Sequence, residues 1–264
     1  MIIKCSKIFI SFICAFLIFS IELYAVESLP RDLETVGVEE KIDHVIPLDT
    51  LVTDSTGKTV PLARILSGDK PVLLSLVYYN CPMLCHLILD GLSQSFQEMK
   101  PAFLDDFIAV SLSFDPEDTP EMAAKFKARY TEDRPVDWRF LVAAPEAIRA
   151  ITAAVGFQYR YIPETGEFAH GSALVALSPT GRIQRYLYGI EYDPFDIRMA
   201  LLDSGQAASR SVIDEFLLFC YTYDSDANSY VLQAWAVMRL AGVATVFIMG
   251  GIIGYLFYSG RRKT

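Results

Sequence analysis

Cysteine and histidine are scarce in this chain, whose 264 residues include five Cys and three His. Cys5 and Cys14 lie close to the N-terminus, which leaves Cys81, Cys85 and Cys220 for the body of the protein. Three thiols are too few for a domain held together by a disulfide framework. In an oxidising compartment, a close pair such as Cys81 and Cys85 either forms a labile disulfide or holds a metal ion, so this pair is the first candidate for function.

Internal repeats, low-complexity segments and an excess of positive charge are also missing. The whole chain has a formal charge of −9. Without the five basic residues near its two ends and Glu22, the body from Val26 to Arg239 keeps 18 basic and 31 acidic residues, a net charge of about −13. A surface of this sign argues against nucleic acid and anionic lipid headgroups as partners. It keeps the domain soluble, or suits a basic protein partner.

The N-terminus has the features of a secretory signal peptide. Lys4 and Lys7 precede the apolar run Ile8–Ile21, and Leu23-Tyr24-Ala25 resembles a cleavage site. We therefore expect residues 1–25 to be removed and residues 26–47 to form an N-terminal extension. A retained signal anchor is the alternative, although the apolar run is short for a membrane span.

A longer apolar run lies near the C-terminus. Leu240–Tyr258 contains 19 residues and no charge, and Arg261-Arg262-Lys263 follows. This length predicts a transmembrane helix, and the positive-inside rule places the basic tail, residues 259–264, in the cytoplasm. We expect a bacterial-type inner-membrane protein with a C-terminal anchor, a juxtamembrane segment at 206–239 and its main domain on the periplasmic side.

The cysteine pair follows a predicted buried strand. Pro71–Val77 is a short aliphatic run, and the apolar spacing over Leu84–Lys100 predicts a helix. Cys81 and Cys85 therefore lie where a strand turns into a helix. At such a site the helix dipole and the free backbone N–H groups favour thiolate over thiol. A thiolate is both a redox nucleophile and a soft metal ligand.

The remaining pattern alternates strands and helices, which predicts a thioredoxin-like α/β domain over residues 48–205. Thioredoxins space their cysteines as C-x-x-C, whereas this chain has C-x-x-x-C, a wider turn that suits a metal ion. The expected elements are a hairpin at 51–60, strands at 107–114, 138–142 and 157–162, helices from Thr119, from Pro145 and from Asp193, and a hairpin formed by 172–177 and 182–188.

Several motifs stand out between about Leu51 and Gly205, namely Asp54–Lys58, Asp69–Leu74, Asn80–Cys85, Ser113–Pro120, and His170 ahead of Leu174–Gly181. With these motifs the chain resembles the Sco/SenC family of membrane-anchored copper chaperones. Together they are specific, although no single one is.

The resemblance implies that Cys81, Cys85 and His170 bind copper, as Cu(I) or Cu(II). It also implies that the recipient is the binuclear copper site of cytochrome c oxidase subunit II, or another periplasmic copper protein. The donor set agrees with this function, because two thiolates and an imidazole suit Cu(I), and Cu(II) if another donor joins. Three ligands leave an open edge through which a partner's ligands can attack, which suits transfer.

The chain departs from the family pattern at several positions. Ala169 stands where an acidic residue usually precedes the histidine, which suggests that a partner fixing the imidazole tautomer is missing. His86 follows the second cysteine in place of proline, and we expect it to point away from Cys85 into solvent or toward a partner. Met83 is either a weak thioether ligand or an apolar packing residue. The anchor is C-terminal, whereas the family anchor is usually N-terminal.

Asp115 and Cys220 also require an interpretation. Asp115, at the end of a predicted strand, either tunes the charge of the cysteine pair or turns the chain with Pro116. Cys220 is interpreted as a small buried hydrophobic residue.

Other classes of function remain open. A thiol–disulfide oxidoreductase that reduces the cysteines of an apo copper site needs Cys81 and Cys85 but not His170. Cys85-His86 completes a C-x-x-x-C-H pattern, one residue longer than the haem-attachment motif. A zinc hydrolase is a poor fit, because no base for an activated water is evident.

Overall fold

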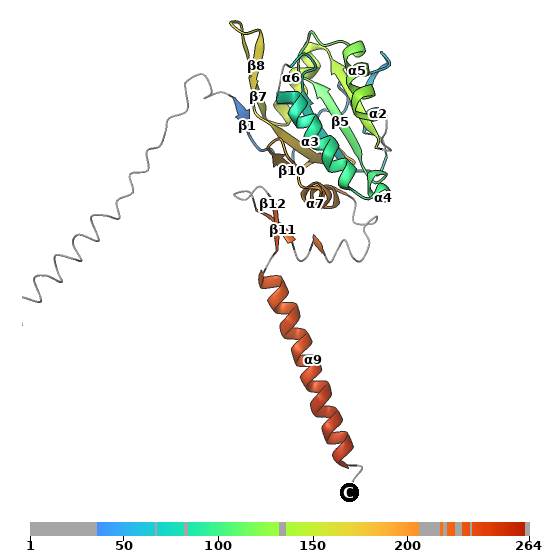
Figure 1. Ribbon diagram of the computed structural model, residues 1–264, viewed down its shortest axis with the longest axis vertical. Helices are drawn as coiled ribbons and strands as arrows, with labels where there is room; N and C mark the ends of the chain where they lie inside the picture. Colours follow the sequence, from blue (N-terminus) through green and yellow to red (C-terminus); the bar gives the residue numbers. More distant parts are fainter. Residues whose placement is uncertain are drawn as a thin grey trace, which may run out of the picture. The chain divides into compact units, whose positions relative to one another are not determined.

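A seven-stranded mixed sheet forms the centre of the protein in the computed structural model, which describes residues 36–66, 68–81, 84–131, 136–205, 217–218, 221–224, 229–232 and 234–261 (Figure 1). These residues belong to one compact unit, Thr35–Thr264. The strand order is β10-β9-β4-β5-β6-β2-β3. The pairs β4–β5 and β5–β6 are parallel, and the other neighbours are antiparallel.

Helices separate most of the successive strands of the central sheet along the chain. The strands of the central sheet are β2 (Leu51–Asp54), β3 (Thr59–Pro61), β4 (Val72–Val77), β5 (Ile108–Ser113), β6 (Trp138–Ala143), β9 (Ala173–Leu177) and β10 (Ile183–Tyr188). The helices are α2 (Leu62–Ile65), α3 (Leu84–Glu98), α4 (Pro101–Leu104), α5 (Pro120–Thr131), α6 (Pro145–Ala154), α7 (Pro194–Ser204) and α9 (Ala234–Arg261).

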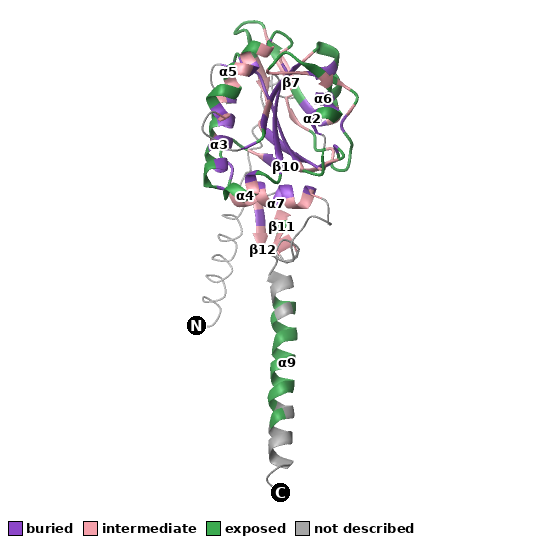
Figure 2. Cartoon of the chain, turned by 90° about the vertical axis from the view of Figure 1, so that its right-hand side faces the viewer, coloured by how far each residue is buried: buried purple, intermediate pink, exposed green. Residues whose placement is uncertain are grey.

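The middle of the sheet is buried on both faces. Every residue of β4 and β5 is buried, which explains why both strands are continuous apolar runs rather than alternating ones. Their two polar positions are paired, since the hydroxyl oxygens of Ser75 and Ser111 lie 2.7 Å apart and the Trp138 indole N–H donates to Ser111 at 2.9 Å. Helices α3 and α5 lie together along one side of this buried sheet (Figure 2).

Most of the expected elements are confirmed. The hairpin β2–β3 closes at Gly57, whose φ of +83° is a conformation that glycine adopts without strain. The helix expected from Leu84 is α3, and the helix expected from Thr119 is α5, in which the Met122 N–H donates to the Thr119 hydroxyl at 3.4 Å.

A second, three-stranded sheet was not expected from the sequence. It has the order β1-β7-β8 and consists of β1 (Gly37–Val38), β7 (Phe157–Ile162) and β8 (Glu167–His170). Of these strands, only β7 was predicted. The two-residue β1 and the four-residue β8 are too short to show a period of their own, and both depend on pairing with β7.

A two-stranded hairpin follows α7 in the segment that was predicted only to connect the domain to a membrane anchor. It is formed by β11 (Tyr221–Asp224) and β12 (Ser229–Leu232). The Tyr230 N–H donates to Asp196 of α7 at 2.8 Å, and Leu217 and Leu218 pack against the core. The juxtamembrane segment is therefore partly a folded part of the domain.

The predictions for the two ends have different outcomes. The predicted signal peptide, residues 1–25, lies outside the described residues, as do residues 26–35 of the extension at 26–47. At the other end, α9 covers the range Leu240–Tyr258. Within the described part of the chain, no helix combines the length and the apolar character required to span a bilayer, so the predicted transmembrane helix is not confirmed.

Candidate metal centre

Cys81 and Cys85 lie at the carboxyl end of β4, where the chain turns into α3. Both side chains are buried, and the two sulfurs are not joined in a disulfide. The Cys85 backbone N–H donates to the Cys81 sulfur at 3.3 Å, and the Tyr78 N–H donates to the Cys85 sulfur at 3.4 Å. The strand-to-helix turn thus places both sulfurs on the same side of the helix start, as the sequence predicted.

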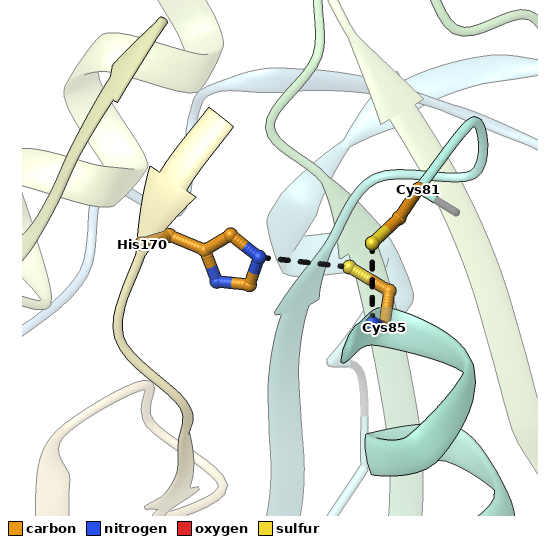
Figure 3. Close-up of side chains that lie close together, drawn as sticks. All are labelled: Cys81, Cys85 and His170. Atoms are coloured by element: carbon orange, nitrogen blue, oxygen red, sulfur yellow. Dashed lines mark hydrogen bonds between the residues drawn. The ribbon is translucent and has the colours of Figure 1, made fainter. Parts of the chain in front are cut away.

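His170 completes a group of three donor atoms. It is the last residue of β8, and its Nε2 lies 3.9 Å from the Cys85 Sγ (Figure 3). The sulfurs of Cys81 and Cys85 and a ring nitrogen of His170 all lie within 4.8 Å of one another. Folding therefore brings a histidine 85 residues from Cys85 to the cysteine turn.

The imidazole tautomer is determined by a backbone carbonyl. The His170 Nδ1 lies 2.7 Å from the Gly171 carbonyl oxygen. A carbonyl oxygen can only accept, so Nδ1 carries the proton and Nε2 presents its lone pair to the sulfurs. The expectation that Ala169 leaves the imidazole without a supporting partner is wrong, because the carbonyl next to the histidine takes the place of an acidic side chain.

Aromatic rings surround the imidazole and limit its movement. Its centroid lies 5.2 Å from the ring of Phe114, 5.8 Å from that of Tyr78 and 6.0 Å from that of Phe157. These contacts surround the imidazole with aromatic rings, and such a shell limits the access of solvent to a metal site.

The predicted lowering of the thiol pKa is wrong for Cys85. Hydrogen bonding to the Cys81 side chain and burial raise the pKa of the Cys85 thiol well above its usual range, although the Tyr78 N–H acts in the opposite direction. Cys85 has no exposed surface, so the hydrogen bond with Cys81 and the desolvation penalty on a thiolate together raise the pKa of this thiol despite its place at a helix start. A metal ion must therefore displace the thiol proton as it binds.

A buried carboxylate behind the cysteine turn was missed by the sequence analysis. Asp118 is 8% exposed, and its Oδ2 accepts from the Tyr79 N–H at 2.6 Å and from the Ser113 hydroxyl at 2.5 Å. Its charge also raises the pKa of Cys85. Asp115, which was considered for this role, instead accepts from the Glu117 N–H at 2.9 Å and turns the chain. The position of Asp118, just before the Thr119 helix cap, was the available sequence signal.

We expect the stability of Asp118→Asn to increase relative to the wild type as the pH rises from about 4 to about 7. Burial raises the pKa of the Asp118 carboxyl. A carboxyl with a raised pKa in the folded state stabilises the fold while it is protonated, and this contribution is lost as the pH rises through that pKa. Asparagine can accept the same two hydrogen bonds and does not ionise. Urea unfolding of both proteins at the two pH values measures the difference between their free energies of unfolding. A difference that stays constant with pH, or that changes in favour of the wild type as the pH rises, contradicts the prediction.

His86 does not belong to the group of three donors, and its side chain is half-buried rather than exposed to solvent. Its ring stacks on Phe126 of α5 with centroids 5.2 Å apart and planes 18° apart. Its Nδ1 is buried and has no hydrogen-bond partner among the residues that the structure describes. Met83 and Cys220, the two other residues singled out from the sequence, lie outside the described residues.

Comparison with known proteins agrees with the fold. The SCO1/SenC family profile matches residues 50–202. A candidate electron transfer protein from Aquifex aeolicus VF5 is 29% identical, with a TM-score of 0.56, covering 62% of this chain and 94% of its own. A SCO1/SenC family lipoprotein from Bacillus anthracis is 22% identical, with a TM-score of 0.54 and coverages of 63% and 98%.

A third related structure is that of Bradyrhizobium japonicum ScoI with copper bound. It is 22% identical, with a TM-score of 0.50 and coverages of 62% and 99%. At this level of identity the likeness concerns the fold. No curated protein sequence matches the chain significantly. The family profile covers more than half of the chain, including the cysteine turn and His170, so the protein belongs to the SCO1/SenC family and has its mixed α/β, thioredoxin-like fold.

Proposed function

We propose that this protein binds copper through Cys81, Cys85 and His170 and delivers it to a copper site of cytochrome c oxidase. The observation that carries the proposal is the convergence of the three donor atoms within 4.8 Å. These residues lie within the part of the chain that the SCO1/SenC family profile matches. Copper is the cargo of such a protein rather than a permanent cofactor.

The donors match the chemistry of copper in both oxidation states. Two sulfur ligands suit Cu(I), and the imidazole nitrogen adds a ligand that Cu(II) prefers. The hydrogen bond of His170 supports this assignment, because with Nδ1 donating to the Gly171 carbonyl, Nε2 is the nitrogen that a neutral imidazole leaves unprotonated toward the sulfurs. The copper-bound structure of Bradyrhizobium ScoI, which has a similar fold, also supports copper as the metal.

The cytochrome c oxidase part of the proposal is supported by family membership and by the open three-ligand site. A site with three protein ligands can gain a ligand from a partner before it loses its own, which allows stepwise transfer of the ion. The binuclear copper site of subunit II is the proposed recipient.

Metal analysis of the purified full-length chain tests copper binding. The protein is reduced, loaded with Cu(I) without oxygen, and desalted against a weak chelator. We expect one copper per chain and metal–sulfur distances near 2.2 to 2.3 Å by X-ray absorption, of the order found for thiolate ligands. Retention of less than a tenth of an equivalent of copper would rule out the proposal.

A dithiol reductase is the second candidate, and the closeness of the two thiols favours it. The sulfurs of Cys81 and Cys85 lie within 4.8 Å of each other. They can convert one disulfide of a partner to two thiols while forming a disulfide between themselves. This reaction does not require His170 as a ligand, so replacement of His170 separates the reductase from the copper carrier.

The membrane placement stays a prediction from the sequence. It is supported by the uncharged run Leu240–Tyr258 and the basic residues after it, which favour a C-terminal anchor with the domain in the periplasm. A reporter fused after Thr264 is expected to be active in a cytoplasmic assay. Activity of a periplasmic reporter at that position would overturn the orientation.

A further inference from the structure

His170 lies at the junction of the two sheets. It ends β8 of the three-stranded sheet, while β9, which begins at Ala173, belongs to the central sheet and pairs with β4. Gly171 and Ser172 are the whole connection between these strands. Because the Gly171 carbonyl also accepts from the His170 imidazole, any movement of this connection moves the metal-facing nitrogen.

The side chain of Ser172 ties this connection to a loop, Gly189–Tyr192. The Ser172 hydroxyl donates to the Gly189 carbonyl and lies 3.4 Å from the Tyr192 hydroxyl. The Tyr192 hydroxyl donates to the same Gly189 carbonyl at 2.6 Å. Two side chains thus converge on one backbone oxygen and hold Ser172 against the loop.

The same loop is attached to α3, the helix that carries Cys85. The Ser95 hydroxyl donates to the Tyr192 carbonyl at 2.5 Å. At Gly91, one turn earlier, a Cβ atom would lie 2.0 Å from the Ile190 carbonyl oxygen, so the loop backbone lies directly on the helix at a position without a side chain. The contact is buried, since Tyr192 and Ser95 are both buried.

These contacts form a continuous connection from the cysteine helix to the histidine, and we propose that it positions His170 relative to Cys85. We call it the histidine bridge and define it as Ser95, Ser172, Gly189 and Tyr192. The proposal rests on the proposed function and adds to it the residues that determine the geometry of the site. Ser172 and Tyr192 are positioning residues, because they act on the metal through His170 and do not contact it.

The bridge predicts an effect that depends on the oxidation state of copper. Loss of a group that orients a metal-bound histidine costs about tenfold to a hundredfold in affinity. We expect Ser172→Ala to lower Cu(II) affinity by about tenfold, and we expect Tyr192→Phe to lower Cu(II) affinity as well. Cu(I) affinity should stay within about twofold of the wild type, since the two thiolates satisfy Cu(I) without a well-placed imidazole.

The experiment measures both affinities in the full-length chain, together with the sulfur-to-Cu(II) charge-transfer absorption and the thermal unfolding midpoint. Ser172→Thr keeps the hydroxyl, so this variant should bind Cu(II) with an affinity close to that of the wild type. Ser178→Ala is the matched control, because Ser178 lies beyond the far end of β9, where its hydroxyl oxygen is 2.8 Å from that of Thr180. An unchanged Cu(II) affinity in Ser172→Ala, or an equal loss of Cu(I) and Cu(II) in step with stability, would overturn the proposal.

A metal-free measurement separates this proposal from the copper function. The His170 and Phe114 rings lie 5.2 Å apart, which is close enough for nuclear Overhauser contacts in the apo protein. Ser172→Ala should weaken these contacts, and Ser178→Ala should not. If the wild type binds no copper, the proposed function fails and the ring contacts alone decide the bridge. Identical ring contacts in Ser172→Ala and the wild type would show that the bridge does not position the histidine.

Discussion

Replacement of Cys85 by serine is expected to abolish copper binding while leaving the domain folded. Cys85 supplies one of two soft donors, and a serine hydroxyl is a hard, protonated group that binds Cu(I) poorly. The serine oxygen can still accept the hydrogen bond that the Tyr78 N–H donates to the sulfur. We expect Cu(I) affinity to fall by more than about a hundredfold, since loss of a group that merely supports a ligand already costs about tenfold to a hundredfold.

Competition with a Cu(I) chelator measures this loss, and thermal unfolding checks the fold. Cys81→Ser should behave in the same way, because the Cys81 sulfur belongs to the same group of donors. Cys220→Ser is the matched control, and we expect it to bind copper as the wild type does. Copper binding of wild-type strength in Cys85→Ser would contradict the assignment of the site.

Replacement of His170 by alanine is expected to separate the copper carrier from the reductase. The two sulfurs remain, so Cu(I) should still bind, whereas Cu(II) loses its nitrogen ligand and should bind more than about a hundredfold more weakly. The Gly171 carbonyl holds the imidazole in the ligating tautomer. We therefore expect the full effect of losing an oriented histidine, rather than the reduced effect that an unsupported ring would give.

The decisive measurement is oxidase assembly in cells that carry each variant. If the protein carries copper, assembly should fail with His170→Ala as well as with Cys81→Ser. His86→Ala serves as the histidine control, because the His86 ring stacks on Phe126 and does not belong to the group of three donors. Full assembly with His170→Ala, together with failure of Cys81→Ser, would leave the dithiol reductase as the function.

The sequence was informative where structure depends on neighbouring residues. The β4 strand, the α3 helix and the cysteine turn between them follow from aliphatic runs and apolar spacing within about thirty residues. Short strands that depend on distant partners were less visible. β8 has four residues and is stabilised by pairing with β7, and no pattern in its own sequence indicates a strand.

The sequence indicated which candidate donor residues the fold brings together, but not the protonation of their side chains. The resemblance to a known family selected Cys81, Cys85 and His170, and the fold brings them within 4.8 Å. Two expectations about their surroundings failed. The Cys85 thiol has a raised pKa rather than a lowered one, and the imidazole is supported by a carbonyl where an acidic side chain was sought.

By itself, the sequence determined the α/β order, the placement of two thiols at a strand-to-helix turn and the family of the protein, because these depend on local patterns and on residue identity. The tertiary structure decided the tautomer of His170, the burial of Cys85, the role of Asp118 in place of Asp115, and the bridge from Ser172 to α3. The physical reason is that hydrogen bonds and desolvation depend on groups that folding brings together from distant parts of the chain.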